Sequence, residues 1–267
     1  MKFLSRKSSI FFFLLLGIIL SSYLTNPFSI KWKKDLPIIE TPRLILRPIE
    51  KQDYVFYQKL FSNPIIMKHY LHGTWSKERL ENRFNNWCHR WEENLFSAFV
   101  IIDKNSKEKI GHAILGHGSF QKKLYGGYPQ LAYIIAPPYW NAKYQDKEKN
   151  IGTKNMNGIG SEVATALVEY SRDLKSKELS APMNVDLSLE KQKEIESLIR
   201  KNKIKHLRNE EGKVTSIYLP LKGVVASCNS ENTGSYRILE KIFIEQYDGQ
   251  IQQDSRKEDR NYFIIFF

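Results

Sequence analysis

Residues 224–241 read VVASCNSENTGSYRILEK, and this stretch decides the fold. The apolar run Val224–Ala226 is typical of a short buried strand. Asn232 is a favourable helix N-cap, because its side chain can accept a hydrogen bond from a free backbone N–H of the first turn. The spacing then places Leu239 on the inward side of the helix. The stretch therefore predicts a buried strand, a turn, and a helix that runs through Lys241.

A second strand, turn and helix lie earlier in the chain. The run Leu131–Ala136 (LAYIIA) is almost wholly apolar, as expected of a central strand buried on both faces, and two prolines follow it. Residues 157–162 (NGIGSE) then open a helix that reaches Asp173. Glycines at a helix start let backbone N–H groups approach a phosphate, and the helix terminus adds partial positive charge. The stretch lacks the third glycine of a Rossmann fingerprint and the Gly-Lys-Ser/Thr of a Walker loop.

The remaining periodic segments predict alternating strands and helices. The expected strands are 43–47, 98–103, 110–115, 242–246 and 262–267, and the expected helices are 53–61 and 77–94. In the longer helix one face carries Leu80, Phe84, Trp87 and Trp91. This order predicts a mixed α/β sheet flanked by helices. The globular domain is expected to span residues 36–267.

Two polar stretches interrupt this pattern. Residues 141–154 and 175–222 are rich in charged side chains, and we interpret both as insertions. Within the second, residues 188–203 predict an exposed helix, supported by Glu196 and Arg200 at i, i+4 spacing.

Residues 1–35 form an N-terminal apolar segment and basic linker. Three basic residues precede an uninterrupted apolar run, Ile10–Leu20, and no charge occurs from Ser8 to Ile30. As a helix, residues 8–25 would span about 27 Å, close to the hydrocarbon thickness of a bilayer. We expect an uncleaved transmembrane anchor, because no A-x-A-like cleavage site is present. A cleaved secretory signal is the alternative.

The composition limits the function classes without selecting one. The chain has 267 residues and a formal net charge of +12. This charge favours anionic partners, but lysines scattered over the surface would also account for it. The two cysteines, Cys88 and Cys228, have no metal-ligand spacing, and the six histidines form no metal motif, so no metal is expected. Free buried thiols are favoured over a disulfide bridge.

Residues 224–241 resemble the late strand and helix of the GNAT superfamily of N-acetyltransferases. The likeness is closest to the ribosomal-protein N-terminal (alanine/serine) acetyltransferase subgroup, with its N-x-x-S…L-E-K pattern. Three further patches resemble the family: TPRLILRP at 41–48, PPYW at 137–140 and DRNYF at 259–263. The four patches occur in family order across residues 38–267.

The resemblance implies a central mixed, splayed β-sheet that binds acetyl-CoA as co-substrate. The strands at 131–136 and 224–226 would part to admit the pantetheine arm, which would pair with the backbone. The implied cofactor-binding residues are Ile134, Ile135, Ala136, Asn155, Met156, Asn157, Gly158, Ile159, Gly160, Ser161 and Asn232. The candidate catalytic residues are Ser235, Tyr133 and Tyr236.

Several positions depart from the family pattern. Gln130 stands where an acidic residue often precedes the central strand, and a neutral amide is no general base. Leu239 stands where many members have a tyrosine that protonates the thiolate. The usual glycine after the last helix is Phe243, and the glycine loop opens with Asn155.

Three hypotheses follow. The first is an acetyltransferase that acts by direct attack of a primary amine, on a protein N-terminus, lysine or small amine, with its domain facing the cytosol where acetyl-CoA is found. The second is a catalytically impaired GNAT-like module that binds CoA or a partner at a membrane. The third is a basic binder of membrane or nucleic acid built around residues 191–213. No aromatic–basic interleaving is present, so a nucleic acid is not an expected partner. Export after signal cleavage is the alternative location.

Overall fold

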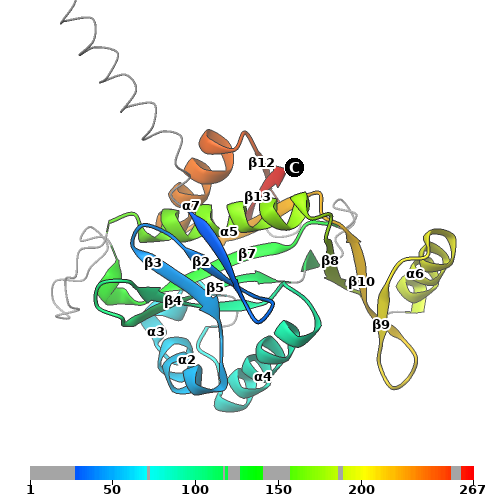
Figure 1. Cartoon of the computed structure of the whole chain (residues 1–267), viewed down its shortest axis with the longest axis horizontal. Helices are drawn as coiled ribbons and strands as arrows, with labels where there is room; N and C mark the ends of the chain where they lie inside the picture. The colour runs from blue at the N-terminus through cyan, green and yellow to red at the C-terminus, as the bar shows by residue number, and fades with distance from the viewer. Residues whose placement is uncertain are drawn as a thin grey trace, which may run out of the picture.

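The computed structural model describes most of the chain after the N-terminal segment. The described ranges are residues 28–70, 73–116, 118–119, 127–140, 157–185, 189–253 and 260–267. They form a large sheet with helices on both faces and a smaller sheet to one side (Figure 1). The expected mixed α/β architecture is confirmed.

The large sheet has nine strands in the order β1-β2-β3-β4-β5-β7-β11-β13-β12. Its strands span Ser29–Lys33 (β1), Leu36–Glu40 (β2), Leu44–Pro48 (β3), Ala98–Asp103 (β4), Lys109–Gly116 (β5), Gln130–Ile135 (β7), Gly223–Asn229 (β11), Gln250–Gln253 (β12) and Arg260–Phe266 (β13). Neighbours pair antiparallel except β7 and β11, which are parallel. The strands predicted at 43–47, 98–103, 110–115, 131–136, 224–226 and 262–267 are all present.

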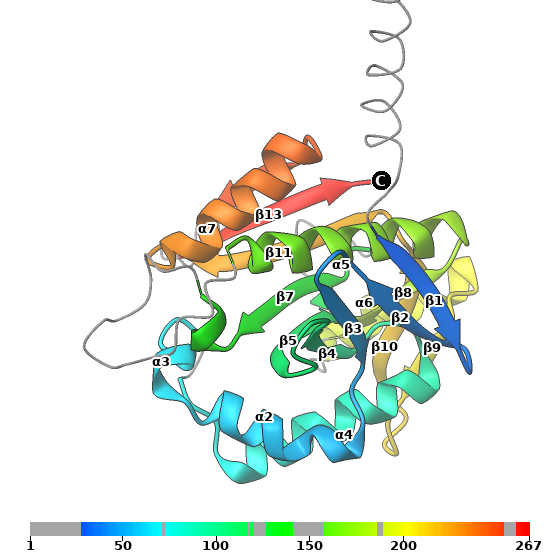
Figure 2. The same cartoon turned by 60° about the vertical axis from the view of Figure 1, so that its left-hand side comes forward.

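One face of the sheet is covered by helices from the first half of the domain (Figure 2). These are η1 (Lys51–Asp53), α2 (Tyr54–Phe61), α3 (Pro64–Met67) and α4 (Lys77–Glu93). Ser76 caps α4 by accepting a hydrogen bond from the Arg79 N–H. The predicted apolar stripe of this helix is buried in the core, because it faces the sheet.

Helix α5 (Ile159–Ser176) covers the other face, together with α7 (Thr233–Leu239) (Figure 2). Val163, Leu167, Tyr170 and Leu174 recur at helical spacing and are all fully buried. The helix begins after Gly158, whose φ of +80° places it in the left-handed region that glycine adopts without strain. A short 3-10 turn, η2 (Pro137–Tyr139), follows β7.

The stretch 175–222 contains a second folded layer. Its elements are β8 (Ser180–Asn184), α6 (Leu189–Asn202), β9 (His206–Arg208) and β10 (Val214–Pro220), and β6 (Gly118–Ser119) completes a four-stranded sheet. The layer has its own apolar core of Met183, Val185, Ile195, Ile199, Val214 and Ile217. The buried Gln192 amide joins α6 to β10: it donates to the Val214 carbonyl at 2.8 Å and accepts from the Val214 N–H at 2.9 Å.

The prediction of a strand at 242–246 is wrong. The chain continues from α7 as a π-helix, η5 (Glu240–Gln246), because the apolar side chains of Ile242 and Phe243 fit a buried helical face as well as a strand. The glycine that ends this longer helix is Gly249, whose N–H donates to the Phe243 carbonyl at 2.7 Å. A Cβ on Gly249 would lie 2.3 Å from the Ile264 carbonyl oxygen, so only glycine fits.

The anchor predicted within residues 1–35 and the insertion at 141–154 fall largely or wholly outside the described residues. Across the described ranges, no helix combines the length and apolar character needed to cross a membrane. Both cysteines are free thiols, as favoured from the sequence.

Candidate functional site

The sheet splays between its two central parallel strands. The register of β7 and β11 comprises only two pairs, Gln130 with Val225 and Leu131 with Ala226. Beyond Leu131, β7 continues to pair with β5 up to Ile135, and beyond Ala226, β11 continues to pair with β13. Each strand therefore keeps its outer partner while the two inner edges separate. The family resemblance implied such a divergence.

The backbone groups of β7 divide between its two neighbours. The Ala136 N–H donates to the Ile110 carbonyl at 2.8 Å, so this amide is already occupied on the β5 side. Backbone groups alternate in direction along a strand, so those of Ile134 also face β5, and those of Tyr133 and Ile135 face β11. The Ile135 carbonyl accepts the Trp140 indole N–H at 2.6 Å. The inner edge of β7 is therefore formed by Tyr133 and Ile135, rather than by the Ala136 amide.

The glycine turn lies at the start of α5, beside β7 and α7. A Cβ on Gly160 would lie 2.7 Å from the Ile238 side chain and 3.4 Å from the Tyr133 ring. Gly160 therefore lets the first turn of α5 approach both neighbours closely. The described residues of the predicted turn are Asn157, Gly158, Ile159, Gly160 and Ser161. The predicted residues Asn155 and Met156 lie outside the described part of the chain.

A polar network fixes this turn to the start of β3. The Glu162 carboxylate accepts hydrogen bonds from the Arg43 Nε–H at 2.6 Å, the Arg43 backbone N–H at 3.0 Å and the Thr41 hydroxyl. The Arg43 Nη1 also donates to the Asn157 carbonyl at 2.8 Å, immediately before Gly158. We name Thr41, Arg43 and Glu162 the turn clamp. It joins segments that lie about 120 residues apart in the sequence.

Three of the predicted polar residues gather near the start of α7. The Tyr133 hydroxyl is buried and, among the described residues, makes no hydrogen bond of ordinary geometry. Burial raises the pKa of Tyr133 well above its usual value, and the nearby Ser235 side chain lowers it by less. Cys228 is close enough to act on both Tyr133 and Tyr236. Tyr236 packs edge to face against Phe263, with ring centroids 5.4 Å apart.

The other predicted positions have mainly structural surroundings. Asn232 caps α7, as expected, by accepting the Ser235 N–H at 3.1 Å. Leu239 is buried in the main core. Gln130 lies where β7 and β11 are still paired. Of the predicted catalytic residues, the structure brings Tyr133 and Ser235 together.

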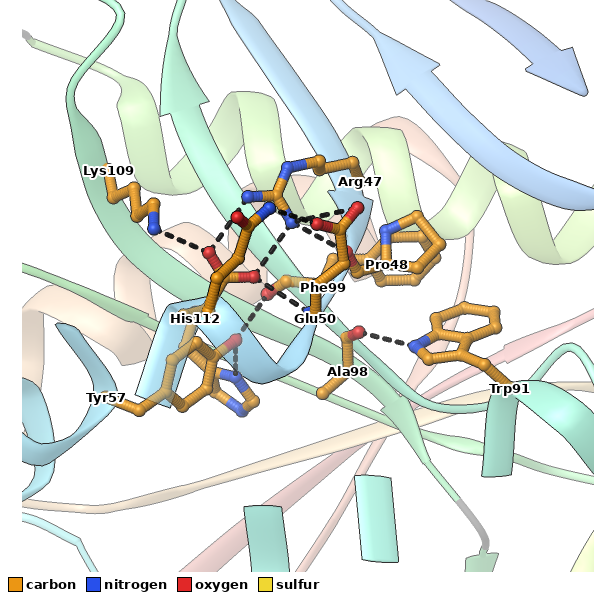
Figure 3. A network of polar contacts seen from close by, with 11 residues as sticks. Arg47, Pro48, Glu50, Tyr57, Trp91, Ala98, Phe99, Lys109 and His112 are labelled. Carbon is orange, nitrogen blue, oxygen red and sulfur yellow. Dashed lines mark hydrogen bonds and ion pairs between the residues drawn. The ribbon is translucent and has the colours of Figure 1, made fainter. Parts of the chain in front are cut away.

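A second polar network, not identified from the sequence, lies on the opposite face of the sheet (Figure 3). The fully buried carboxylate of Asp53 binds Arg47 through two bonds of 2.8 and 2.9 Å and Lys109 at 2.6 Å. Burial raises the pKa of Asp53, but the bonds from Arg47 and Lys109 together lower it below its ordinary value. Nearby, His112 Nδ1 lies 3.1 Å from the Tyr57 hydroxyl, which donates to the Phe99 carbonyl (Figure 3).

The His112 ring is enclosed by Tyr57, Phe61 and Trp87. Burial lowers its pKa to about 3, so it is neutral at physiological pH. The described residues contain no group of three His, Cys, Asp or Glu side chains arranged to hold a metal ion. The Asp53 network and the His112–Tyr57 contact hold η1 and α2 to the sheet. His112 also lies beside the diverging part of β7, because it pairs in register with Ile134.

Part of the chain is similar in sequence to known acetyltransferases. Residues 43–147 match the family model described as an acetyltransferase (GNAT) domain. An uncharacterized N-acetyltransferase, YoaA of Bacillus subtilis (strain 168), is 30% identical over 135 residues, which are 50% of this chain and 66% of that protein, just under two thirds of its length. This part of the chain is therefore similar in sequence to GNAT acetyltransferase domains.

Comparison with solved structures finds two bacterial acetyltransferases among the matches. A GNAT-family acetyltransferase from Bacillus anthracis has 18% identity and a TM-score of 0.48, covering 86% of this chain and 98% of its own. Spermidine N-acetyltransferase from Vibrio cholerae, in complex with CoA and spermine, has 17% identity and a TM-score of 0.43, covering 84% and 95%.

Proposed function

We propose that this protein is an acyl-CoA-dependent N-acetyltransferase, which transfers an acetyl group from acetyl-CoA to a primary amine by direct attack. The observation that carries the proposal is the divergence of β7 and β11 after Leu131 and Ala226, with the glycine turn of α5 beside it. An extended pantetheine arm can pair with an unpaired strand edge as a substitute strand. The amides of Gly158–Ser161, at the N-terminus of a long helix, suit a diphosphate.

The residues present fit such a cofactor. The inner edge of β7 offers backbone groups of Tyr133 and Ile135, which alternation directs towards β11. The buried Tyr133 hydroxyl has no ordinary hydrogen-bond partner among the described residues, and buried polar groups normally have one. A bound group that accepts its hydrogen bond would satisfy it.

Direct attack is favoured over a cysteine-linked intermediate. When bound, acetyl-CoA supplies a thioester carbonyl carbon that a neutral amine can attack. Burial raises the pKa of the Cys228 thiol to about 11, so it stays protonated and is a poor nucleophile. Tyr133, whose pKa is also raised, stays protonated and can donate a hydrogen bond to the sulfur as negative charge develops there. The Ser235 side chain lies nearby, and the proton lost by the amine passes to water.

The test is release of free CoA thiol from acetyl-CoA in the presence of primary amines, measured together with a thermal shift on CoA titration. We expect CoA alone to stabilise the fold and a suitable amine to release thiol. Absence of both effects in a folded sample would refute the proposal.

CoA binding without turnover is the second candidate, and Gln130 favours it. This amide stands at the beginning of the diverging strand where a carboxylate could deprotonate the amine. Thermal stabilisation by CoA with no thiol release from N-terminal peptides, lysine or small amines would select this candidate.

We also propose that the apolar run in residues 1–35 holds the domain at the cytosolic face of a membrane. Its sequence is long enough to span, and it directly precedes β1. Protease accessibility of the full chain in sealed vesicles tests this. The vesicles should have the cytosolic face of the membrane on the outside. Digestion of the domain only after the vesicles are opened would then place the domain on the non-cytosolic side and contradict the proposal.

A further inference from the structure

Three arginines gather on the sheet face opposite α5, at the end of the diverging strands. Arg260 begins β13 and donates from Nη1 to the Ser227 hydroxyl of β11 at 3.0 Å. Ser227 lies one residue beyond the last pairing of β11 with β7. Side chains alternate along a strand, so Ser227 points away from the face that Cys228 shares with Tyr133. Arg260 is therefore directed to the face that carries α2, α3 and α4.

The other two arginines come from α4. Arg79 and Arg83 are one helical turn apart and share a face of that helix. The Arg79 guanidinium lies 4.8 Å from the centre of the Trp75 ring, and the Trp75 and Tyr70 rings are 5.8 Å apart. Burial raises the pKa of the Tyr70 hydroxyl, and the positive charges of Arg83, Arg79 and Arg260 act in the opposite direction.

We propose that this arginine cluster recognises a carboxylate on the amine substrate, so that the preferred acceptor is an acidic peptide N-terminus rather than a polyamine. The inference rests on the proposed acetyltransferase function and narrows its acceptor. Planar guanidinium groups suit carboxylates, because their N–H donors match both carboxylate oxygens. A cationic acceptor would meet like charges and be disfavoured.

The experiment compares three tetrapeptides with the same N-terminal serine, at low salt: Ser-Ala-Asp-Asp, Ser-Ala-Asn-Asn and Ser-Ala-Lys-Lys, with spermidine as a fourth acceptor. We expect kcat/KM for the acidic peptide to exceed that for the neutral one by about tenfold, and the basic peptide and spermidine to be poorest. Added salt should reduce the differences in kcat/KM among the four acceptors.

Arg260→Gln and Arg83→Gln should each reduce the preference of acidic over neutral peptide by about fivefold. Arg200→Gln, an exposed arginine on α6 in the second layer, is the matched control and should leave the preference unchanged. Equal use of acidic and neutral peptides, or preference for spermidine, would overturn the inference.

A binding measurement separates this inference from the proposed function. Fluorescence anisotropy of labelled Ser-Ala-Asp-Asp on the CoA-saturated full chain needs no turnover. Binding that weakens in Arg260→Gln but not in Arg200→Gln supports the cluster even if no thiol is released. If the labelled peptide does not bind, or binds Arg260→Gln as tightly as the unchanged protein, the inference is refuted.

Discussion

The turn clamp gives a prediction in which stability and cofactor affinity respond differently to two halves of one ion pair. Glu162→Ala removes the acceptor of three hydrogen bonds, from Thr41 and from two donors of Arg43. The Glu162 side chain is 11% exposed and that of Arg43 is 38% exposed. The loss should therefore fall below the roughly 3–5 kcal/mol of a fully buried pair. We expect about 2 kcal/mol, or about 4–8 °C in Tm.

CoA affinity should respond more strongly to the loss of Arg43 than to the loss of Glu162. Arg43→Ala leaves an uncompensated carboxylate in the first turn of α5, beside the amides of Gly158–Ser161, where negative charge competes with a phosphate. We expect this variant to weaken CoA binding about tenfold. Glu162→Ala removes the competing charge, so its CoA affinity should change less than about threefold, and the double variant should recover most of the loss in Arg43→Ala.

Isothermal titration with CoA and urea unfolding measure the two quantities. Arg172→Ala is the matched control, because Arg172 pairs with Glu169 at 3.3 Å on the same helix, far from its start, and is 55% exposed. It should cost less than about 1 kcal/mol and leave CoA binding unchanged. If the double variant binds CoA as weakly as Arg43→Ala, Arg43 contacts the cofactor itself and the charge argument fails.

Three further predictions concern buried polar groups. Tyr133→Phe should lower kcat at least about tenfold with little change in the KM for acetyl-CoA. It should not destabilise the fold, because the hydroxyl lacks an ordinary hydrogen-bond partner among the described residues. A loss of stability with unchanged kcat would assign the hydroxyl a structural role. Asp53→Asn should cost about 3 kcal/mol in urea unfolding, because it removes the buried carboxylate that Arg47 and Lys109 share and leaves Arg47 with Glu50, which is more distant at 3.9 Å and exposed; a cost under about 1 kcal/mol would contradict this. His112 has its pKa lowered to about 3 from an ordinary 6.5, so below pH 6.5 the unfolded chain binds a proton that the folded chain does not. Stability should therefore fall as pH drops from about 6.5 towards 3, by at most about 1.4 kcal/mol per unit, and His112→Leu should reduce the slope measured by urea unfolding between pH 7 and 5.

The sequence predicted the strands and helices whose apolar periodicity is long or continuous. Leu131–Ala136 and the stripe of α4 are examples, because burial on the sheet enforces their pattern. Residues 242–246 were predicted as a strand because five residues with three adjacent apolar side chains fit either structure. Only the packing of Phe243 against Phe263, at 6.2 Å between ring centroids, shows which one forms.

The site was predicted unevenly for a similar reason. Asn232 and the glycine turn carry local signals, since a cap and a positive φ depend on neighbours in sequence. The turn clamp was missed because Arg43 and Glu162 lie 119 residues apart. From the sequence, Glu162 entered only as the last residue of NGIGSE, and Arg43 only in the strand 43–47 and in TPRLILRP. The arginine cluster was missed because its members come from α4 and β13, which share no sequence pattern.

The layer inserted between α5 and β11 keeps an apolar interior separate from that of the main sheet. Groups of residues that share a core tend to open together, so this layer should exchange its amide hydrogens as one unit, ahead of the nine-stranded sheet. A melting curve for the whole chain would then combine two events, and a ligand held by α5 and β7 would shift only the later one.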